Sequence, residues 1–242
     1  MYSKEFEAII QRRRSNRKFD PNVKVPEEVM HRSLQRTILS PNSSNMQLWE
    51  FYWIHSEEEK KKFIPLCLGQ AAAKTAQEMV VFVTRQDLWK KRAQFNINRI
   101  KENIKPGEEP NPMIKNGLKY YGKLMPVLYK NDIFGFYATL RRMVCLIMGI
   151  NKPFMRFGGH ADQRVMVHKS CALAAQTFML SIAAEGFESC PMEGFDQIRV
   201  KKALGLSSGA EINMIISVGK GTEEGIWGPR YRVPYEEVVF EK

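Results

Sequence analysis

Met79-Val80-Val81-Phe82-Val83 is an uninterrupted apolar run, which is typical of a strand buried inside a sheet. Two other segments predict strands. They are Trp49-Glu50-Phe51-Tyr52-Trp53-Ile54, which is rich in aromatic residues, and the run from Asn213 to Val218. Helical patterns separate these strands along the chain. Strands separated by several helices predict an α+β sandwich around a mixed sheet.

Helices are expected before, between and after these strands. The first covers 3–14, with Ser3 as its N-cap. The second covers 26–39 and opens with proline and two glutamates, which suit the first turn of a helix. A long buried helix is expected to stop at Gly186, a glycine in the C′ position. That long helix and a shorter charged one cover 165–185 and 57–63.

The middle of the chain departs from this pattern. Between about residues 85 and 164 the periodicity weakens, although stretches near 88–103 and 132–149 still look helical. Prolines at 110 and 112 break the chain between them. We therefore expect one domain over residues 1–242, with a helical excursion at about 85–164 that covers a pocket.

Composition places the chain among ordinary soluble proteins. Hydrophobic residues make up 44% and charged residues 26% of the 242 residues. The four cysteines lie far apart without CxxC pairs, so neither a disulfide framework nor a zinc site is expected. The chain starts without an apolar signal core, and its longest apolar stretch, 171–184, is shorter than the roughly 20 residues of a membrane span. We expect a cytoplasmic protein with no membrane partner.

The net charge of +11 leaves several partners open. It is compatible with a solvated surface, an anionic ligand or a nucleic acid. A nucleic-acid-binding protein should show a basic stripe with interleaved aromatic residues or a helix-turn-helix, whereas the arginines here fall in separated loops. The four histidines are dispersed and lack the spacing of paired metal ligands. We therefore expect neither nucleic-acid nor metal binding.

Two glycine motifs fail for lack of context. Gly205-Leu206-Ser207-Ser208-Gly209 matches G-x-S-x-G, but that motif needs a strand before the serine and a helix after it, and here the order is reversed. Gly219-Lys220-Gly221 follows a strand, but too little chain remains for a dinucleotide-binding βαβ unit.

Three other segments contain residues suited to binding the same kind of ligand. Arg13-Arg14-Ser15-Asn16-Arg17 ends the first helix, and the polar loop Ser40 to Trp49 offers short amides and hydroxyls to a planar heterocycle. In the tail, Arg230 and Arg232 alternate in extended chain, so both can point at one phosphate. Together these segments predict a site for an anionic ligand with a flat ring.

The sequence resembles the nitroreductase family of FMN enzymes. That family has an R-x-S-x-R/K segment after its first helix, then an SPSS-x-N-x-QPW loop, and later a P-x-E-G-F segment after a long buried helix. The counterparts here are Arg13 to Arg17, Ser40 to Trp49 and Pro191 to Phe195, with Arg230 and Arg232 as the closing basic pair. Asn42 stands where the family usually has serine, and Leu48 replaces proline.

The resemblance implies an α+β, nitroreductase-like three-layer sandwich, whose mixed and mainly antiparallel sheet is flanked by helices. It also implies FMN as cofactor. Arg17 would approach the N1–O2 edge of the flavin, where a cation stabilises negative charge. A backbone N–H near Glu193 or Gly194 would donate to flavin N5. The full set of implied cofactor-binding residues is Arg13, Arg14, Ser15, Arg17, Pro41, Asn42, Ser43, Asn45, Gln70, Pro191, Met192, Glu193, Gly194, Arg230 and Arg232.

The resemblance further implies a homodimer in which the tail at about 228–242 reaches the partner subunit, with Tyr235 to Phe240 as an added edge strand. The implied reaction moves a hydride from NADH or NADPH through flavin N5 to a small acceptor of aromatic, quinone or nitro type. No catalytic side chain stands out. Two alternatives stay open: a flavin-dependent dehalogenase or dehydrogenase of another small substrate, and a flavin-binding protein without catalysis.

Overall fold

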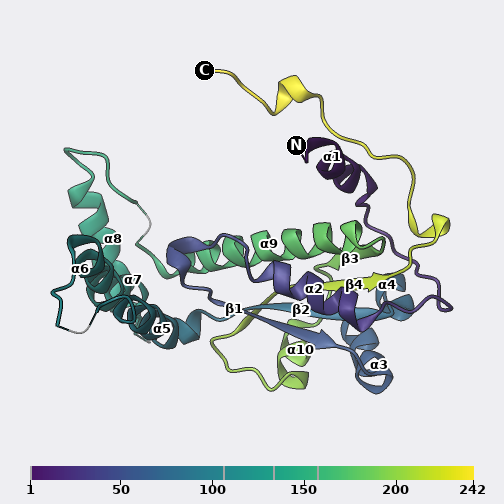
Figure 1. The fold of residues 1–242 in the computed structure, drawn as a ribbon, viewed down its shortest axis with the longest axis horizontal. Coiled ribbons are helices and arrows are strands. Elements are labelled where there is room, and N and C mark those ends of the chain that lie inside the picture. Colours follow the sequence, from purple (N-terminus) through teal and green to yellow (C-terminus); the bar gives the residue numbers. More distant parts are fainter. Residues whose placement is uncertain (1, 106, 133, 157) are drawn as a thin grey trace.

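The computed structural model describes residues 2–105, 107–132, 134–156 and 158–242. Within these residues a four-stranded sheet forms the centre, in the order β1-β2-β4-β3 (Figure 1). All of its neighbouring strands pair antiparallel. The only parallel pairing in the described chain is an isolated bridge between Ser15 and Ser189. The strands are β1 (Trp49–Ile54), β2 (Glu78–Thr84), β3 (Glu188–Met192) and β4 (Glu211–Gly219).

The central strand β2 separates two hydrophobic cores. Val80 and Phe82 pack against the helices α2 and α9, whereas Met79, Val81 and Val83 face the helices on the other side. Because side chains alternate along a strand, an uninterrupted apolar run is required when both faces are covered. The layers are α2 (Glu27–Thr37) and α9 (His160–Ala184) on one face, with α3 (Glu57–Leu66), α4 (Ala71–Thr75) and α10 (Gln197–Ala203) on the other (Figure 1). The expected three-layer α+β sandwich is confirmed.

The expected helices and strands are present with small shifts, but one N-cap is wrong and several elements were missed. Gly186 adopts φ 86° directly after α9, as expected for a glycine at C′. Ser3 is not an N-cap, because α1 (Ser3–Arg12) already begins there and Tyr2 precedes it without a side-chain cap. Strand β3 was not expected, since it contains Pro191. An edge strand tolerates proline, because its outer N–H positions need no partner strand.

The excursion forms a helical lobe beyond one end of the sheet (Figure 1). The buried Arg141 ties this lobe together, donating to the carbonyl oxygens of Lys130 and Gly158 at 2.5 and 3.2 Å. The two expected helices are present as α5 and α8, but α6, η3 and α7 between them were missed. The lobe comprises η2 (Gln86–Leu88), α5 (Trp89–Lys101), α6 (Pro112–Lys119), η3 (Tyr120–Leu124), α7 (Met125–Tyr129) and α8 (Phe136–Met148).

The C-terminal tail runs over the surface. After η4 (Glu223–Gly225) it is extended and exposed, and it ends with η5 (Tyr235–Glu237). Tyr235 to Phe240 form no strand in this single chain, so a strand added to a partner stays a prediction. Helix α9 meets a length-and-hydropathy test for a membrane span, but half of that window is buried in the fold, as in core helices of soluble proteins.

Candidate functional site

Arginines from both ends of the chain meet at the C-terminus of α1. Arg13 follows that helix directly, and Arg230 donates to the carbonyl oxygens of Gln11 and Arg13 at 3.0 and 2.7 Å. A guanidinium is favourable there, because the last carbonyls of a helix lack intrahelical partners and carry its negative dipole end. Arg14 similarly donates to the carbonyl oxygen of Gly228 at 2.8 Å. The tail is thereby fixed beside the Arg13–Arg17 segment.

This arginine cluster, formed by Arg13, Arg14, Arg230 and Arg232, has excess positive charge. Burial and then the charges of Arg230, Arg232 and Arg14 lower the pKa of Arg13. In the described part of the chain the arginine ion pairs involve other residues, such as Arg12 with Glu188. Gathering like charges without an acid costs free energy unless an anion binds among them. The cluster therefore fits an anionic group such as a phosphate.

Asn16 holds the segment that carries the expected cofactor-binding residues Arg13 to Arg17, and sequence reasoning missed it. Its side chain is 1% exposed. It donates to the Thr222 carbonyl oxygen at 2.8 Å and accepts from the Lys18 N–H at 3.0 Å. A Cβ on Gly225 would lie 2.7 Å from the Lys18 nitrogen, so this turn requires glycine. The sequence did contain a signal for this role. Asn16 lies between the expected ligands Ser15 and Arg17, and in extended chain its side chain points to the opposite side from theirs.

Arg17 lies over an aromatic ring. Its guanidinium carbon is 4.2 Å from the centroid of Trp227, and its Nη1 donates to the Ser15 carbonyl oxygen at 3.3 Å. Stacking on an indole leaves the remaining N–H groups of a guanidinium free to face a ligand edge. Arg17 is thus held in place, and no carboxylate of the described residues pairs with it.

The segment after β3 forms a second part of the site. Gln70 donates to the carbonyl oxygens of Gly194 and Cys67 at 2.5 and 3.1 Å, which fixes the turn at the strand end. A Cβ on Gly194 would approach the Gln70 amide nitrogen to 3.2 Å. The beginning of β3 contacts Ser15 through the Ser15–Ser189 bridge. Strand β3 therefore connects the arginine cluster to the Pro191–Gly194 segment.

The polar loop forms a third part, around η1 (Ser43–Asn45). The Asn42 carboxamide oxygen accepts from the Gln47 N–H at 2.8 Å, and the Ser43 N–H donates to the Ser170 hydroxyl of α9 at 3.1 Å. Asn45 has φ 48°, a left-handed conformation that asparagine tolerates better than most residues. These hydrogen bonds fix the loop, whose side chains are exposed at Pro41 and Asn45 and half-buried between them.

One chain does not bring all three parts together. Ser43 contacts Ser170 within α9, whereas Arg12 beside the arginine cluster donates to the Gly186 carbonyl oxygen beyond the end of α9. From Ser170 to the end of α9 at Ala184 there are fourteen residues of helix, which corresponds to about 21 Å at 1.5 Å per residue. The cluster and the Pro191–Gly194 segment are linked, but the loop 41–45 lies apart from the cluster along α9 (Figure 1).

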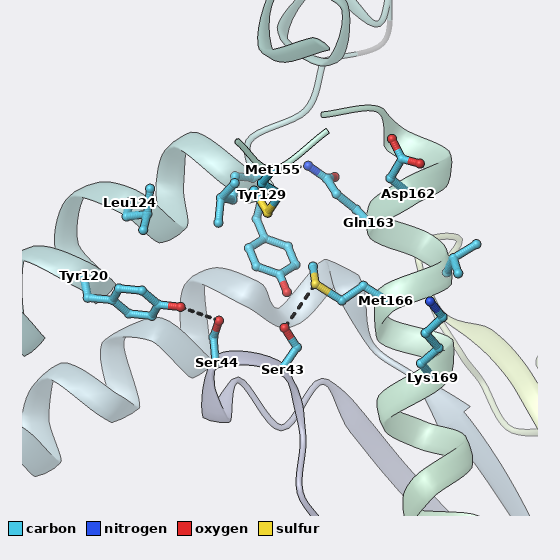
Figure 2. A pocket seen from close by; sticks show the side chains of 12 residues that line it. Ser43, Ser44, Tyr120, Leu124, Tyr129, Met155, Asp162, Gln163, Met166 and Lys169 are labelled. Carbon is cyan, nitrogen blue, oxygen red and sulfur yellow. Dashed lines mark hydrogen bonds between the residues drawn. The ribbon is translucent and has the colours of Figure 1, made fainter. Parts of the chain in front are cut away.

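A pocket of about 350 Å³ lies between the excursion and the first turns of α9, and Ser43 and Ser44 of the loop line one side of it (Figure 2). Tyr120 and Ser44 share a hydrogen bond of 2.6 Å at one wall, and the Tyr121 hydroxyl donates to the Ser44 carbonyl oxygen at 2.9 Å. The walls are mostly apolar. They are formed by Ser43, Ser44, Tyr120, Leu124, Leu128, Tyr129, Met155, Asp162, Gln163, Val165, Met166 and Lys169.

Comparisons with known proteins give one family match and similar folds. The nitroreductase family model matches residues 10–220. The NADH dehydrogenase of Thermus thermophilus is 27% identical over 231 residues, covering 95% of this chain and 92% of that protein. A nitroreductase-like protein from Streptococcus mutans superposes with a TM-score of 0.72 at 16% identity, covering 99% and 98% of the two chains. The NADPH:FMN oxidoreductase of Vibrio harveyi, solved with NAD+, gives a TM-score of 0.63 at 16% identity, with 98% and 76% covered.

Proposed function

Because the chain belongs to the nitroreductase family, we propose that it is an FMN-dependent oxidoreductase that uses NADH or NADPH to reduce a small aromatic, quinone or nitro-type acceptor. The observation that carries this proposal is the arginine cluster, which gathers positive charge without a carboxylate partner among the described residues. The names of the Thermus and Vibrio relatives, an NADH dehydrogenase and an NADPH:FMN oxidoreductase, support the same donor and cofactor.

The residues present fit FMN. A phosphate would neutralise the repulsion in the cluster, with Arg13 and Arg232 as direct donors and Ser15 beside them. Arg230 is already engaged by the carbonyl oxygens of α1, so its role is to hold Arg13 as well as to add charge. When bound between these residues, FMN would supply the hydride-transfer chemistry that links the nicotinamide donor to the acceptor.

Two other groups of residues serve the ring. Arg17, held on Trp227, would place positive charge at the N1–O2 edge. The turn at Glu193–Gly194, fixed by Gln70, would present a backbone N–H toward N5. The missing side chain of Gly194 permits that close approach. Within this proposal, the protein binds and orients the cofactor and supplies electrostatic stabilisation, without a side chain acting as acid or base.

We expect NADH or NADPH to bleach the visible flavin absorption of the purified protein under anaerobic conditions, and an added quinone to restore it. The nucleotide that bleaches faster identifies the donor. Absorbance spectra recorded during a titration test this directly. A bound flavin that neither nucleotide reduces would contradict the reductase proposal and favour flavin binding without this catalysis. A protein that takes up no FMN at all would overturn the cofactor assignment too.

We also infer that the working form is a homodimer in which the loop 41–45 of one protomer completes the site of the other. The separation of about 21 Å between loop and cluster along α9 supports this arrangement. The exposed tail after Gly228, fixed to the cluster through Arg14, is free to reach a second subunit. In such a dimer each site would need residues from both chains.

Complementation between two defective variants tests the shared site. One variant carries Arg13→Gln with Arg232→Gln. The other carries Asn45→Asp, which keeps a residue tolerant of left-handed backbone but adds a carboxylate beside the flavin. Unfolding and refolding them together should restore about a quarter of the wild-type activity, since half of the dimers are mixed and each has one intact site. Activity no higher than that of the separate variants would show that each site belongs to one chain.

A further inference from the structure

The pocket between the excursion and α9 contains a hydroxyl group that none of the described residues binds. Tyr129 is 2% exposed, and its ring points into the pocket (Figure 2). We propose that this pocket binds an uncharged ring compound through a carbonyl oxygen that accepts a hydrogen bond from the Tyr129 hydroxyl. The inference rests on the proposed function and deepens it, because it names the chemical class of the acceptor.

The donor character of Tyr129 follows from its surroundings. Burial, followed by the nearby Tyr120, raises the pKa of Tyr129 to about 12, so the hydroxyl keeps its proton across the physiological range. Its neighbours have other partners. Ser43 directs its hydroxyl to the sulfur of Met166 at 3.1 Å, and Tyr120 is bound to Ser44. The Tyr129 hydroxyl donates to none of the described residues, so an oxygen of a ligand in the pocket can accept its hydrogen bond.

The shape of the pocket suits an apolar ring. Its volume of about 350 Å³ lies at the lower end of the usual range for small-molecule sites. Leu124, Met155 and Met166 are among the side chains that line it, together with the ring of Tyr120 (Figure 2). Thioethers adapt to flat ligands and make favourable contacts with aromatic rings. The pocket thus offers dispersion contacts to the body of the ligand and one tyrosine hydroxyl as donor.

The charges around the pocket favour an uncharged ligand. Asp162 and Lys169 both line it, so their opposite charges cancel. Asp162 also accepts from the Gly159 N–H at 2.9 Å, and its carboxylate would repel an anion. A ligand carboxylate would need several donors to offset its desolvation, and a nitro oxygen accepts hydrogen bonds more weakly than a carbonyl. A quinone or cyclic enone meets the requirements best.

The pocket adjoins the proposed cofactor site. Ser43 and Ser44 line it from the loop 41–45, and Ser43 belongs to the residues expected to contact the flavin. A ring held on Tyr129 would lie against the inner side of this loop. Tyr129 would act as a specificity-determining residue, because it selects the acceptor through a contact that an apolar analogue cannot make.

Binding of a matched pair of probes tests the proposal. Equilibrium dialysis of the oxidised FMN-loaded protein would compare 2,3-dimethyl-1,4-naphthoquinone with 2,3-dimethylnaphthalene, which has the same rings without carbonyls. In Tyr129→Phe we expect affinity for the quinone to fall about 3- to 10-fold, while affinity for the hydrocarbon is unchanged. Tyr137→Phe is the matched control. It makes the same change in the excursion, away from the lining residues, and should alter neither affinity.

The location is tested by Leu124→Trp, which fills the pocket and should weaken both probes together. Equal losses for both probes in Tyr129→Phe, or no loss for the quinone, would overturn the role of the hydroxyl. Unchanged binding in Leu124→Trp would overturn the pocket as the site. These measurements involve no turnover. If neither NADH nor NADPH reduced the flavin, the proposed function would be refuted, but the binding of the two probes to the pocket could still be measured and interpreted.

Discussion

Replacing Arg13 and Arg232 together with glutamine is expected to weaken FMN binding by about two to four orders of magnitude, while riboflavin binding stays nearly unchanged. Each arginine would supply a charge-assisted hydrogen bond to the phosphate, worth about 1.5–3 kcal/mol. Riboflavin lacks the phosphate and therefore does not use the cluster. Quenching of flavin fluorescence, titrated with both compounds, gives the ratio of the two dissociation constants.

The apoprotein provides an internal check on the same variant. Burial and then repulsion within the cluster lower the pKa of Arg13, so removing two of the charges should not reduce the free energy of unfolding of the FMN-free protein. Arg12→Gln is the matched control, because Arg12 is the neighbouring residue but pairs with Glu188 at 2.6 Å. It should leave the preference for FMN over riboflavin intact. If the double variant lost the same factor of affinity for FMN and for riboflavin, the cluster would not be the site that binds the FMN phosphate.

The second large effect is expected for Asn16→Ala. This change leaves the Lys18 N–H without its acceptor and the Thr222 carbonyl with only the Gly225 N–H, and it should lower the free energy of unfolding by about 2–4 kcal/mol. FMN affinity should fall as well, because Arg13, Ser15 and Arg17 are carried by the released segment. Urea denaturation at fixed protein concentration, with and without FMN, measures both effects.

Asn22→Ala is the control for this prediction. Asn22 is exposed and donates to the Asp20 carboxylate within the same turn, so its loss should cost less than about 0.5 kcal/mol. If Asn16→Ala were as stable as this control, Asn16 would not hold the ligand segment. If stability fell but FMN affinity did not, the segment would not bind the cofactor.

The periodicity of apolar residues in the sequence was sufficient to predict the strands and helices of the core. The apolar run in β2 required cover on both faces, and the positions of α2, α9, β1 and β4 followed from local patterns within a few residues. Strand β3 was not predicted, because its short sequence contains proline and lacks an apolar pattern. An edge strand can have such a sequence, since it pairs with only one neighbouring strand. The helices α6 and α7 were missed for a related reason. They pack mainly within the excursion, and their apolar faces are short.

By itself, the sequence determined the layered core and which residue types are available to bind a phosphate and a flat ring, because these depend on local pattern and on chemistry. The tertiary structure alone decided how they are combined. It joined Arg230 to the end of α1, set Asn16 against the turn at Gly225, separated the loop 41–45 from the cluster, and buried the Tyr129 hydroxyl beside a pocket. Such contacts join residues distant in the chain, and their geometry depends on packing that no local pattern records.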